Sequence, residues 1–406
     1  MKVTKEEIQR TVTESPLVLF YQGIKADATR QRYSRMLKLV LCNMFEEILD
    51  GDLEQRAVQF VKHGRENPDW TRDLLLILSR KLRDRTGLPR EHPEYLNPAS
   101  IGMYFKPIKK LLDMNDIVIS WKRIYATYPE LDNVHDTRGW TRQEIQRMLR
   151  FSRPMDRAMI LVSASSGIRI GGFTGLEWQD LVPIYRTADG ALQMERTESQ
   201  DGAEIVCATL KIYRGTSESY PAFVTPEAYH SIQDYREEWM AQIGREPRQD
   251  EPIFIKSGDL QRRATIATVR KHVSTVIARA RLRVPGSKIS RRYDVPMMNG
   301  FRRFWNKACK ESLSRDSPLS SLIKKEFMMG HVGLVKLDRN YFKSNIVELA
   351  EEYLNAVPNL TIDDAVRLRE SNRRKDERIR KLEDEKDTRI SDLEEMVRQM
   401  ATHMKK

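Results

Sequence analysis

Three short segments in the second half of the chain carry side chains that could bind and attack a phosphate. Ser-Gly-Ile-Arg ends at Arg169, Asn-Gly-Phe-Arg-Arg contains Arg302 and Arg303, and Met-Gly-His ends at His331, ten residues before Tyr341. A guanidinium is always charged and can donate to two phosphate oxygens at once. A tyrosine hydroxyl, with an ordinary pKa of about 10, becomes a nucleophile only near cations or a base. These residue types fit a site in which arginines hold a phosphate and Tyr341 attacks it.

Each segment also has a structural explanation when it is taken alone. An arginine after a turn is most often a surface residue or a partner of buried carbonyls, and single tyrosines are usually structural. Phe301, Phe304 and Trp305 share one face of a predicted helix and belong in a core. That placement puts Arg302 at the core edge, facing a cleft, and turns Arg303 toward solvent or a DNA backbone.

The composition favours a polyanionic partner. The chain has 406 residues, enough for two or three domains, with 70 Lys and Arg against 58 Asp and Glu and a net charge of +12. Cys42, Cys207 and Cys309 are too scattered for a disulfide framework or a zinc site, and the histidines form no metal-binding cluster. No apolar stretch of about 18 residues and no signal peptide is present. We therefore expect a cytoplasmic protein that needs no metal or other cofactor and does not enter a membrane.

The first third of the chain is predicted to be helical. A helix is expected over residues 27–49 and another over 99–117, the second interrupted at Pro107. A polar, turn-rich stretch over 128–140 is the best linker candidate, and Thr141 with Glu144 forms a capping box for the next helix. The apolar positions of the first helix are Tyr33, Met36, Leu37, Val40, Met44 and Ile48.

The rest of the chain mixes elements. An apolar helix over 157–170 ends at a Ser-Ser-Gly turn, and residues 204–213 and 220–225 form a predicted hairpin, with helices resuming from Pro226. Residues 345–362 carry an apolar stripe that folds onto its own domain or docks on a neighbour's. From about Asp364 the sequence is almost continuously charged. Its heptad of Ile379, Leu382, Leu393, Met396 and Met400 is interrupted by Lys386 and Arg389, which leaves a short imperfect coiled coil, a solvated single helix and a disordered tail as alternatives.

The order of these segments resembles the tyrosine recombinases, the phage-integrase family. The resemblance covers residues 139–362, and the part around His331 is most similar to archaeal-type integrases; the N-terminal helices are similar only in placement and helicity. It implies a fold that is mainly α with a small β component: a helical core-binding domain over 1–135, a mixed α/β tyrosine-recombinase catalytic domain over 139–362, and a charged helical tail over 364–406.

The resemblance also implies roles for single residues. Arg169 and Arg302 match the two arginines that grip the non-bridging oxygens of the scissile phosphate. His331 matches the residue that hydrogen-bonds this phosphate. Tyr341 matches the nucleophile that forms a 3′-phosphotyrosine link and frees a 5′-hydroxyl.

The hairpin and two departures from the family pattern complete the expected site. The family places a general-acid lysine on the hairpin, where this chain offers Lys211, with Arg214 closer to the turn and too basic to give up a proton. Asn299 stands where the family usually has histidine, and it can hydrogen-bond a phosphate but cannot shuttle a proton. Gly172 replaces a frequent acidic residue that orients its neighbours. Neither departure removes the phosphate clamp, so the catalytic machinery is expected to be intact. Two fixed guanidiniums can stabilise the transition state as a metal would, which accounts for the absence of metal motifs.

The leading hypothesis is therefore a site-specific DNA recombinase that integrates or excises a mobile element. Its partners would be double-stranded DNA with a recombination site and further copies of itself, as a tetramer on DNA, the free protomers being monomeric or weakly associated. The alternatives are a type IB topoisomerase-like enzyme and a non-catalytic DNA-binding relative, which Asn299 alone favours. The side chains expected on DNA phosphates are Lys25, Arg30, Arg32, Arg35, Lys106, Lys109, Lys110, Arg214 and Arg303.

Overall fold

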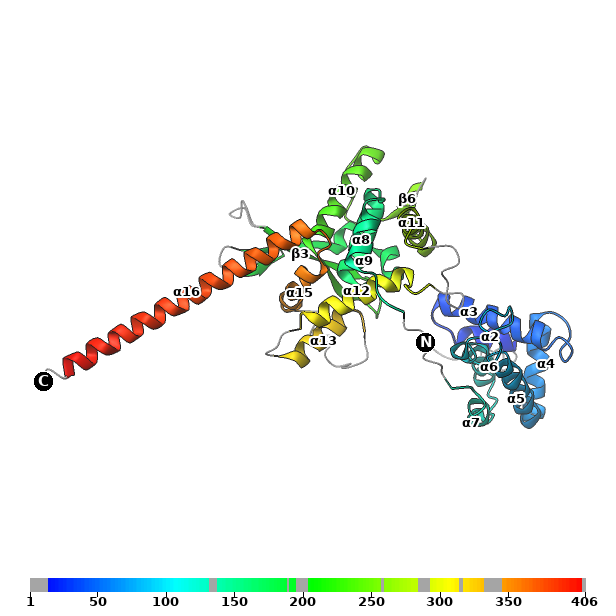
Figure 1. Cartoon of the computed structure of the whole chain (residues 1–406). Coiled ribbons are helices and arrows are strands. Elements are labelled where there is room, and N and C mark those ends of the chain that lie inside the picture. The colour runs from blue at the N-terminus through cyan, green and yellow to red at the C-terminus, as the bar shows by residue number, and fades with distance from the viewer. Residues whose placement is uncertain are drawn as a thin grey trace, which may run out of the picture. The chain divides into compact units, whose positions relative to one another are not determined.

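Two compact units make up the chain, which divides between residues 136 and 137 (Figure 1). Helices predominate in both, and within the described residues strands occur only in the second unit. The expected fold, mainly α with a small β component, is confirmed. This computed structural model describes residues 14–130, 137–187, 190–194, 204–256, 259–283, 293–313, 317–331 and 345–403.

Within the described residues of unit 1, all regular secondary structure is helical. Several of its helices begin at side-chain caps: Asp52 and Gln55 form a capping box, and the Asn67 side chain accepts from the backbone N–H of Trp70. One apolar core joins the helices. The elements are α2 (Pro16–Gln22), α3 (Asp27–Lys38), η1 (Leu39–Met44), α4 (Leu53–Glu66), α5 (Pro68–Asp84), η2 (Pro98–Ser100), α6 (Gly102–Met114) and α7 (Trp121–Tyr125).

Two details of the predicted helices in unit 1 are wrong. The first helix changes at Leu39 into the π-helical turn η1, and the wider turn shifts the helical phase. This helical structure ends at Met44, five residues before the predicted end. In the turns beyond it Leu49 is fully buried, whereas Ile48, expected in the core, is 41% exposed. Pro107 does not interrupt α6: its ring is buried inside a continuous helix, where apolar packing offsets the one backbone hydrogen bond that proline removes.

Unit 2 is built around a four-stranded antiparallel sheet with strand order β2-β1-β3-β4. The predicted hairpin is confirmed as β3 paired with β4, with Leu210 opposite Ala222. The pairing of β1 with β3 and the small sheet of β5 and β6 were not predicted. The strands are β1 (Leu181–Arg186), β2 (Leu192–Gln193), β3 (Glu204–Ile212), β4 (Tyr220–Val224), β5 (Ile255–Lys256) and β6 (Asp259–Arg263).

Helices cover the sheet on both faces. The predicted capping box of Thr141 and Glu144 opens α8, and the predicted apolar helix α9 ends at Gly167 in the left-handed conformation. Helix α9 packs against α10, α11 and α12. The helices of unit 2 are α8 (Arg142–Leu149), α9 (Pro154–Ser166), η3 (Ile170–Gly175), η4 (Trp178–Asp180), α10 (Pro226–Ile243), α11 (Ile266–Arg279), α12 (Met297–Glu311), α13 (Pro318–Met328), α15 (Ile346–Leu360) and α16 (Asp364–His403).

The apolar stripe of α15 folds onto unit 2 of its own chain. Leu349 and Tyr353 are at most 1% exposed, and the Tyr353 ring stacks on Phe223 of β4 with centroids 5.4 Å apart. The Tyr353 hydroxyl donates to the carbonyl of Ser165 in α9 (2.8 Å). Of the two placements expected for this stripe, the structure therefore contains the one within a single chain.

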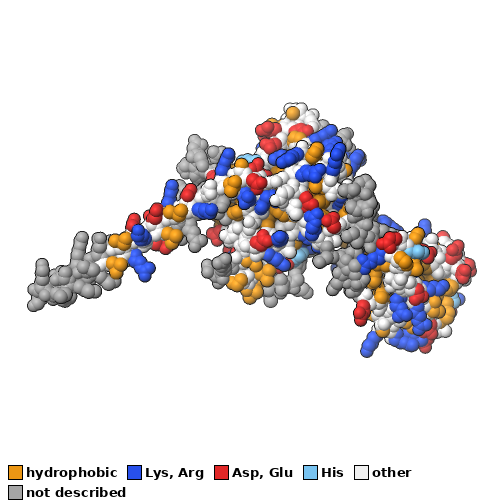
Figure 2. Space-filling view, viewed as in Figure 1, with side chains coloured by type: hydrophobic (Ala, Val, Ile, Leu, Met, Phe, Trp, Pro, Cys, Tyr) orange, Lys and Arg blue, Asp and Glu red, His pale blue; other side chains and the backbone are white. Residues whose placement is uncertain are grey.

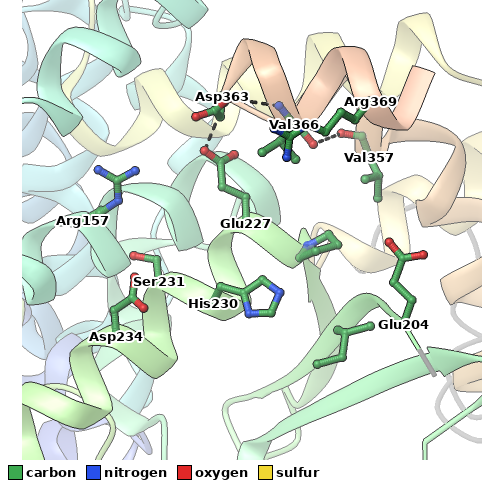
Figure 3. Close-up of a pocket in the computed structure, with 13 residues that line it drawn as sticks. Arg157, Glu204, Glu227, His230, Ser231, Asp234, Val357, Asp363, Val366 and Arg369 are labelled. Atoms are coloured by element: carbon green, nitrogen blue, oxygen red, sulfur yellow. Dashed lines mark hydrogen bonds between the residues drawn. The ribbon is translucent and has the colours of Figure 1, made fainter. Parts of the chain in front are cut away.

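The start of α16 is fixed by contacts with α8 and α10. Two backbone N–H groups, of Ile362 and Asp363, donate to the carboxylate of Glu227 (2.7 and 3.1 Å), and Arg142 donates to the carbonyl of Thr361. Glu227 lines a cavity of about 700 Å³ beside the first turn of α16 (Figure 3). Beyond it α16 continues as one uninterrupted helix (Figure 1). Among the described residues, no helix combines the length and the apolar character needed to span a membrane.

Candidate active site

Arg302 is the centre of the predicted site. It lies on α12 between Phe301 and the exposed Arg303, and it is only 8% exposed. Its guanidinium donates to the carbonyl of Gly167 at the end of α9 (2.6 Å) and to the carbonyl of Met329 (2.7 Å). A buried charge requires such partners, because desolvation without hydrogen bonds is costly. Three chain segments therefore meet at one guanidinium, whose remaining N–H groups can still donate to an anion.

Arg169 reaches the same turn from the other side. It follows the left-handed Gly167 by two residues, is exposed, and donates from Nη1 to the carbonyl of Gly330 (3.3 Å). The two arginines thus bind the consecutive carbonyls of Met329 and Gly330. Burial lowers the pKa of Arg302, and the positive charge of Arg169 lowers it further. Two like charges held this close favour an anion between them.

His331 completes this cluster. Its Nε2 lies 2.8 Å from Nη2 of Arg302, and its Nδ1 lies 2.6 Å from a carboxylate oxygen of Glu326. Glu326 also pairs with the buried Lys325 (2.7 Å). Burial by itself would raise the pKa of Glu326, but the hydrogen bonds from Lys325 and His331 outweigh it and hold this pKa below its ordinary value. The histidine is therefore anchored on both ring nitrogens.

Gly330 makes the turn between α13 and His331 possible. Its φ of +67° lies in the left-handed region, which residues with a side chain rarely adopt. A Cβ at this position would stand 2.5 Å from the ring of Tyr220 on β4. Only glycine lets the turn approach the hairpin closely enough to place the Met329 carbonyl and His331 against Arg302.

Tyr213 lies beside the arginines and was not predicted to belong to the site. It directly follows the last residue of β3 and has a φ of +53°, and a Cβ on Gly171 would stand 3.2 Å from its hydroxyl. Burial raises the pKa of Tyr213, while the charges of Arg169 and Arg302 act in the opposite direction. Together with the adjacent Tyr220 it forms an aromatic wall of the site.

Lys211 and Arg214, the two hairpin candidates, have different surroundings. Arg214 forms an ion pair with Asp180, whose side chain is completely buried, and Arg214 itself is one third exposed. Lys211 is exposed at the end of β3, opposite Pro221. The structure thus gives Arg214 a structural partner and leaves Lys211 accessible at the strand end.

The other predicted residues of unit 2 are placed as follows. Asn299 and Arg303 are exposed on α12, and Asn299 lies three residues before Arg302, on the same side of the helix. Gly172 is buried, and a Cβ there would stand 3.2 Å from Ile212, so the hairpin packs closely where the family pattern has an acidic residue. Tyr341 lies outside the described residues.

The expected DNA-binding residues of unit 1 lie on or near α3 and α6, which pack together. Arg32 and Lys106 line one hollow of about 390 Å³ between these helices. The ammonium of Lys109 lies 5.6 Å from the ring centroid of Trp121. Helices α3 and α6 thus bring two of the basic side chains to one place. Of the remaining residues, Lys110 is partly buried and the exposed ones are Lys25, Arg30 and Arg35.

Sequence reasoning missed Glu326, Tyr213 and Tyr220. Glu326 precedes His331 by five residues on α13, and no sequence motif marks a carboxylate at that distance. Tyr213 directly precedes the hairpin turn, and this position in the sequence could have indicated that it belongs to the site. Among the described residues, no group of three His, Cys, Asp or Glu side chains could hold a metal ion.

Comparisons with known proteins place the chain near solved recombinase structures. No family model matches it, and neither does any curated protein. It is similar to XerA recombinase at 12% identity, covering 85% of this chain and 98% of that one with a TM-score of 0.33. It is also similar to a lambda integrase dimer bound to a core site, at 13% identity over 84% and 95% of the chains with a TM-score of 0.41. XerH recombinase bound to difH substrate matches at 15% identity over 79% and 94%, with a TM-score of 0.40. Because these sequence identities and TM-scores are low, the function of this chain has to be inferred from the residues of its own site.

Proposed function

We propose that the protein is a site-specific DNA recombinase that cleaves and rejoins strands through a tyrosine–phosphate intermediate. The observation that carries the proposal is the convergence of Arg169, Arg302 and His331 on the 329–331 turn. Two guanidiniums and an imidazole come together from three segments of the chain, of which the first two, at Arg169 and Arg302, are more than 130 residues apart. The two guanidiniums are fixed donors that suit the non-bridging oxygens of a phosphodiester, and the imidazole holds Arg302 in place.

The proposed reaction divides the roles among these residues. Arg169 and Arg302 bind the scissile phosphate and stabilise the charge of the pentavalent transition state. The Tyr341 oxygen attacks phosphorus and loses its proton to solvent water. The bond to the 5′ oxygen breaks, and that oxygen takes a proton from Lys211. The products are a 3′-phosphotyrosine and a 5′-hydroxyl, and the reverse attack by another 5′-hydroxyl rejoins the strands.

The test is the capture of a covalent protein–DNA adduct on a nicked duplex, in buffer containing EDTA. The wild-type chain should form the adduct, and Tyr341→Phe should not, while its affinity for the duplex stays within a few-fold. Tyr213→Phe is the matched control, because Tyr213 lies beside both arginines and should remain dispensable for the adduct. Adduct formation by Tyr341→Phe, or its loss in Tyr213→Phe, would make the assignment of the nucleophile wrong.

The nicked substrate also separates the alternative functions. A non-catalytic DNA-binding protein would form no adduct under any condition. Transfer of a labelled strand between two duplexes is expected for a recombinase, whereas relaxation of a supercoiled plasmid without transfer would indicate a topoisomerase-like enzyme. Integration or excision of a mobile element is the role we propose for such strand transfer.

A further inference from the structure

Helix α16 exposes a regular apolar face along its length. Leu368, Ile379, Leu382 and Leu393 are between 52% and 55% exposed. Their spacings of eleven, three and eleven residues place them on one side of the helix, in heptad positions. Figure 2 shows apolar side chains interspersed with charged ones along this segment. Large apolar side chains repeated on one helical face are typical of a surface that binds another helix.

The charges along α16 are divided into two blocks. Residues 364–381 contain eight Lys and Arg and four Asp and Glu, a net charge of +4. Residues 382–396 contain seven Asp and Glu and two Lys and Arg, a net charge of −5. The first half of the helix is therefore basic and the second half acidic, with the change falling between Ile379 and Leu382.

We propose that α16 pairs with α16 of a second copy of this chain in antiparallel orientation. In that arrangement the basic half of each helix faces the acidic half of the other, whereas a parallel pair would place like charges together. DNA is a poorer occupant of this face, because the acidic half would be repelled by phosphates. The surface is thus complementary to itself only when one copy is reversed.

The apolar positions agree with this orientation. When Ile379 of one copy faces Leu382 of the other, Leu368 faces Leu393, because these leucines lie eleven residues outward on either side. A single register therefore brings all four exposed apolar side chains of each helix into contact with those of the other. The centre of the helix pair then falls at the boundary between the basic and the acidic block. The same register brings Lys375 close to Lys386 of the other copy, so the pair is expected to be weak and reversible.

Disulfide cross-linking of full-length chains tests the orientation. A chain with Leu368→Cys mixed with a chain with Leu393→Cys should give a disulfide-linked dimer under mild oxidation, and either chain alone should not. The unsubstituted chain controls for Cys42, Cys207 and Cys309, the last two of which are buried. A mixture of Leu368→Cys and Leu382→Cys is the register control and should cross-link at least tenfold less.

Two outcomes would overturn the proposal. Efficient dimerisation of the Leu368→Cys chain with itself would show a parallel pair, and no enrichment of the mixed dimer over the register control would show that the helices do not pair. A second experiment tests the charge pairing with the same cross-link as its readout.

Adding Glu383→Lys, Glu385→Lys and Asp387→Lys to both chains should reduce the yield of the mixed dimer about tenfold. Adding Arg369→Glu, Lys375→Glu and Arg380→Glu to the same chains should then restore it. A mixed dimer that is insensitive to these changes would exclude charge pairing.

Discussion

The carboxylate of Glu326 lies 2.6 Å from Nδ1 of His331, on the far side of the ring from Arg302, which lies 2.8 Å from Nε2. A guanidinium only donates, so Nε2 must accept in this state. In this arrangement the other ring nitrogen, Nδ1, donates to Glu326. Lys325, at 1% exposure, fixes the carboxylate from behind. The orientation of the imidazole is thus determined by a residue that does not face the phosphate site.

Replacing Glu326 should change both the rate and the pH dependence of cleavage. Glu326→Gln keeps an acceptor for Nδ1, and Glu326→Ala removes it, so we expect adduct formation to slow about tenfold in the alanine variant and less in the glutamine variant. The pKa of the wild-type carboxylate is held below its ordinary value of 4.5, so it is ionised throughout the assay range. The wild-type rate should therefore fall only at acid pH below this range, where the carboxylate takes up a proton, and the glutamine variant should lack this fall. Identical profiles for both proteins would assign Glu326 a purely structural role.

The two site arginines should be far more sensitive to substitution than their neighbour. Arg302→Lys and Arg169→Ala each remove a bidentate donor, and we expect cleavage to fall by about 10²-fold, the effect of losing one donor to a developing oxyanion. Arg303→Ala is the matched control on the same helix, since Arg303 is exposed, and it should retain cleavage within a few-fold. Single-turnover cleavage rates at saturating protein give the comparison. Equal losses in all three variants would indicate a general effect of charge on DNA binding.

Gly330→Ala should inactivate the site without removing any functional group. The added Cβ would meet the Tyr220 ring at 2.5 Å, and the left-handed backbone conformation adds about 1 to 2 kcal/mol of strain. The turn must then move, which displaces His331 and the carbonyls that hold the arginines. Gly175→Ala is the control, because a Cβ added there would have no atom of the described residues within 4 Å. Cleavage by Gly330→Ala at the wild-type rate would show that the turn tolerates displacement.

We expect Arg214 to have a structural role and Lys211 a catalytic one. Arg214→Ala leaves the completely buried Asp180 carboxylate without its ion pair, and we expect the free energy of unfolding of unit 2 to fall by about 3 to 5 kcal/mol. Lys211→Ala, at an exposed position, should change it by less than about 0.5 kcal/mol. Denaturant unfolding of both variants measures the difference.

A modified substrate tests the proton donor in the same two variants. A 5′-bridging phosphorothiolate has a leaving group that needs no proton, so it should restore cleavage by Lys211→Ala. It should not restore cleavage by Arg214→Ala under conditions where that variant is folded. The opposite pattern would make Arg214 the functional hairpin residue.

Removal of most of α16 should affect assembly on DNA and leave cleavage intact. Truncation after Arg369 keeps the contacts of Asp364 with Gln146 and of Glu227 with the 362–363 backbone. We expect adduct formation within a few-fold of wild type and a lower yield of synaptic complexes. Sedimentation of the full-length and truncated chains, with and without DNA, measures both states. An unchanged tetramer yield would mean that the tail is a passive extension.

Local signals in the sequence predicted much of unit 2. The capping box at Thr141, the turn at Gly167 and the hairpin of β3 and β4 each depend on a few adjacent residues, and all three are confirmed. The aromatic face of its helix predicted Arg302 at the edge of the core, facing a cleft, and the structure buries it further, to 8% exposure. The contact of Glu326 with His331 depends on how a turn is folded back against α12, and periodicity carries no information about it. The same holds for the π-helical turn after Lys38, which shifts the helical phase without a sequence signature.

The position of α15 in the core of unit 2 has a consequence for synthesis of the chain. Tyr353 stacks on Phe223 and donates to the carbonyl of Ser165, so this core cannot close until α15, which ends at Leu360, has been translated. The core of unit 1 needs nothing beyond Ile124. At ordinary elongation rates of about 5 to 20 residues per second, the two events are separated by roughly ten to fifty seconds. Unit 1 can therefore fold while it is still tethered to the ribosome, whereas the apolar faces of β4 and α9 stay uncovered until α15, which begins 122 residues after the end of β4, has been translated.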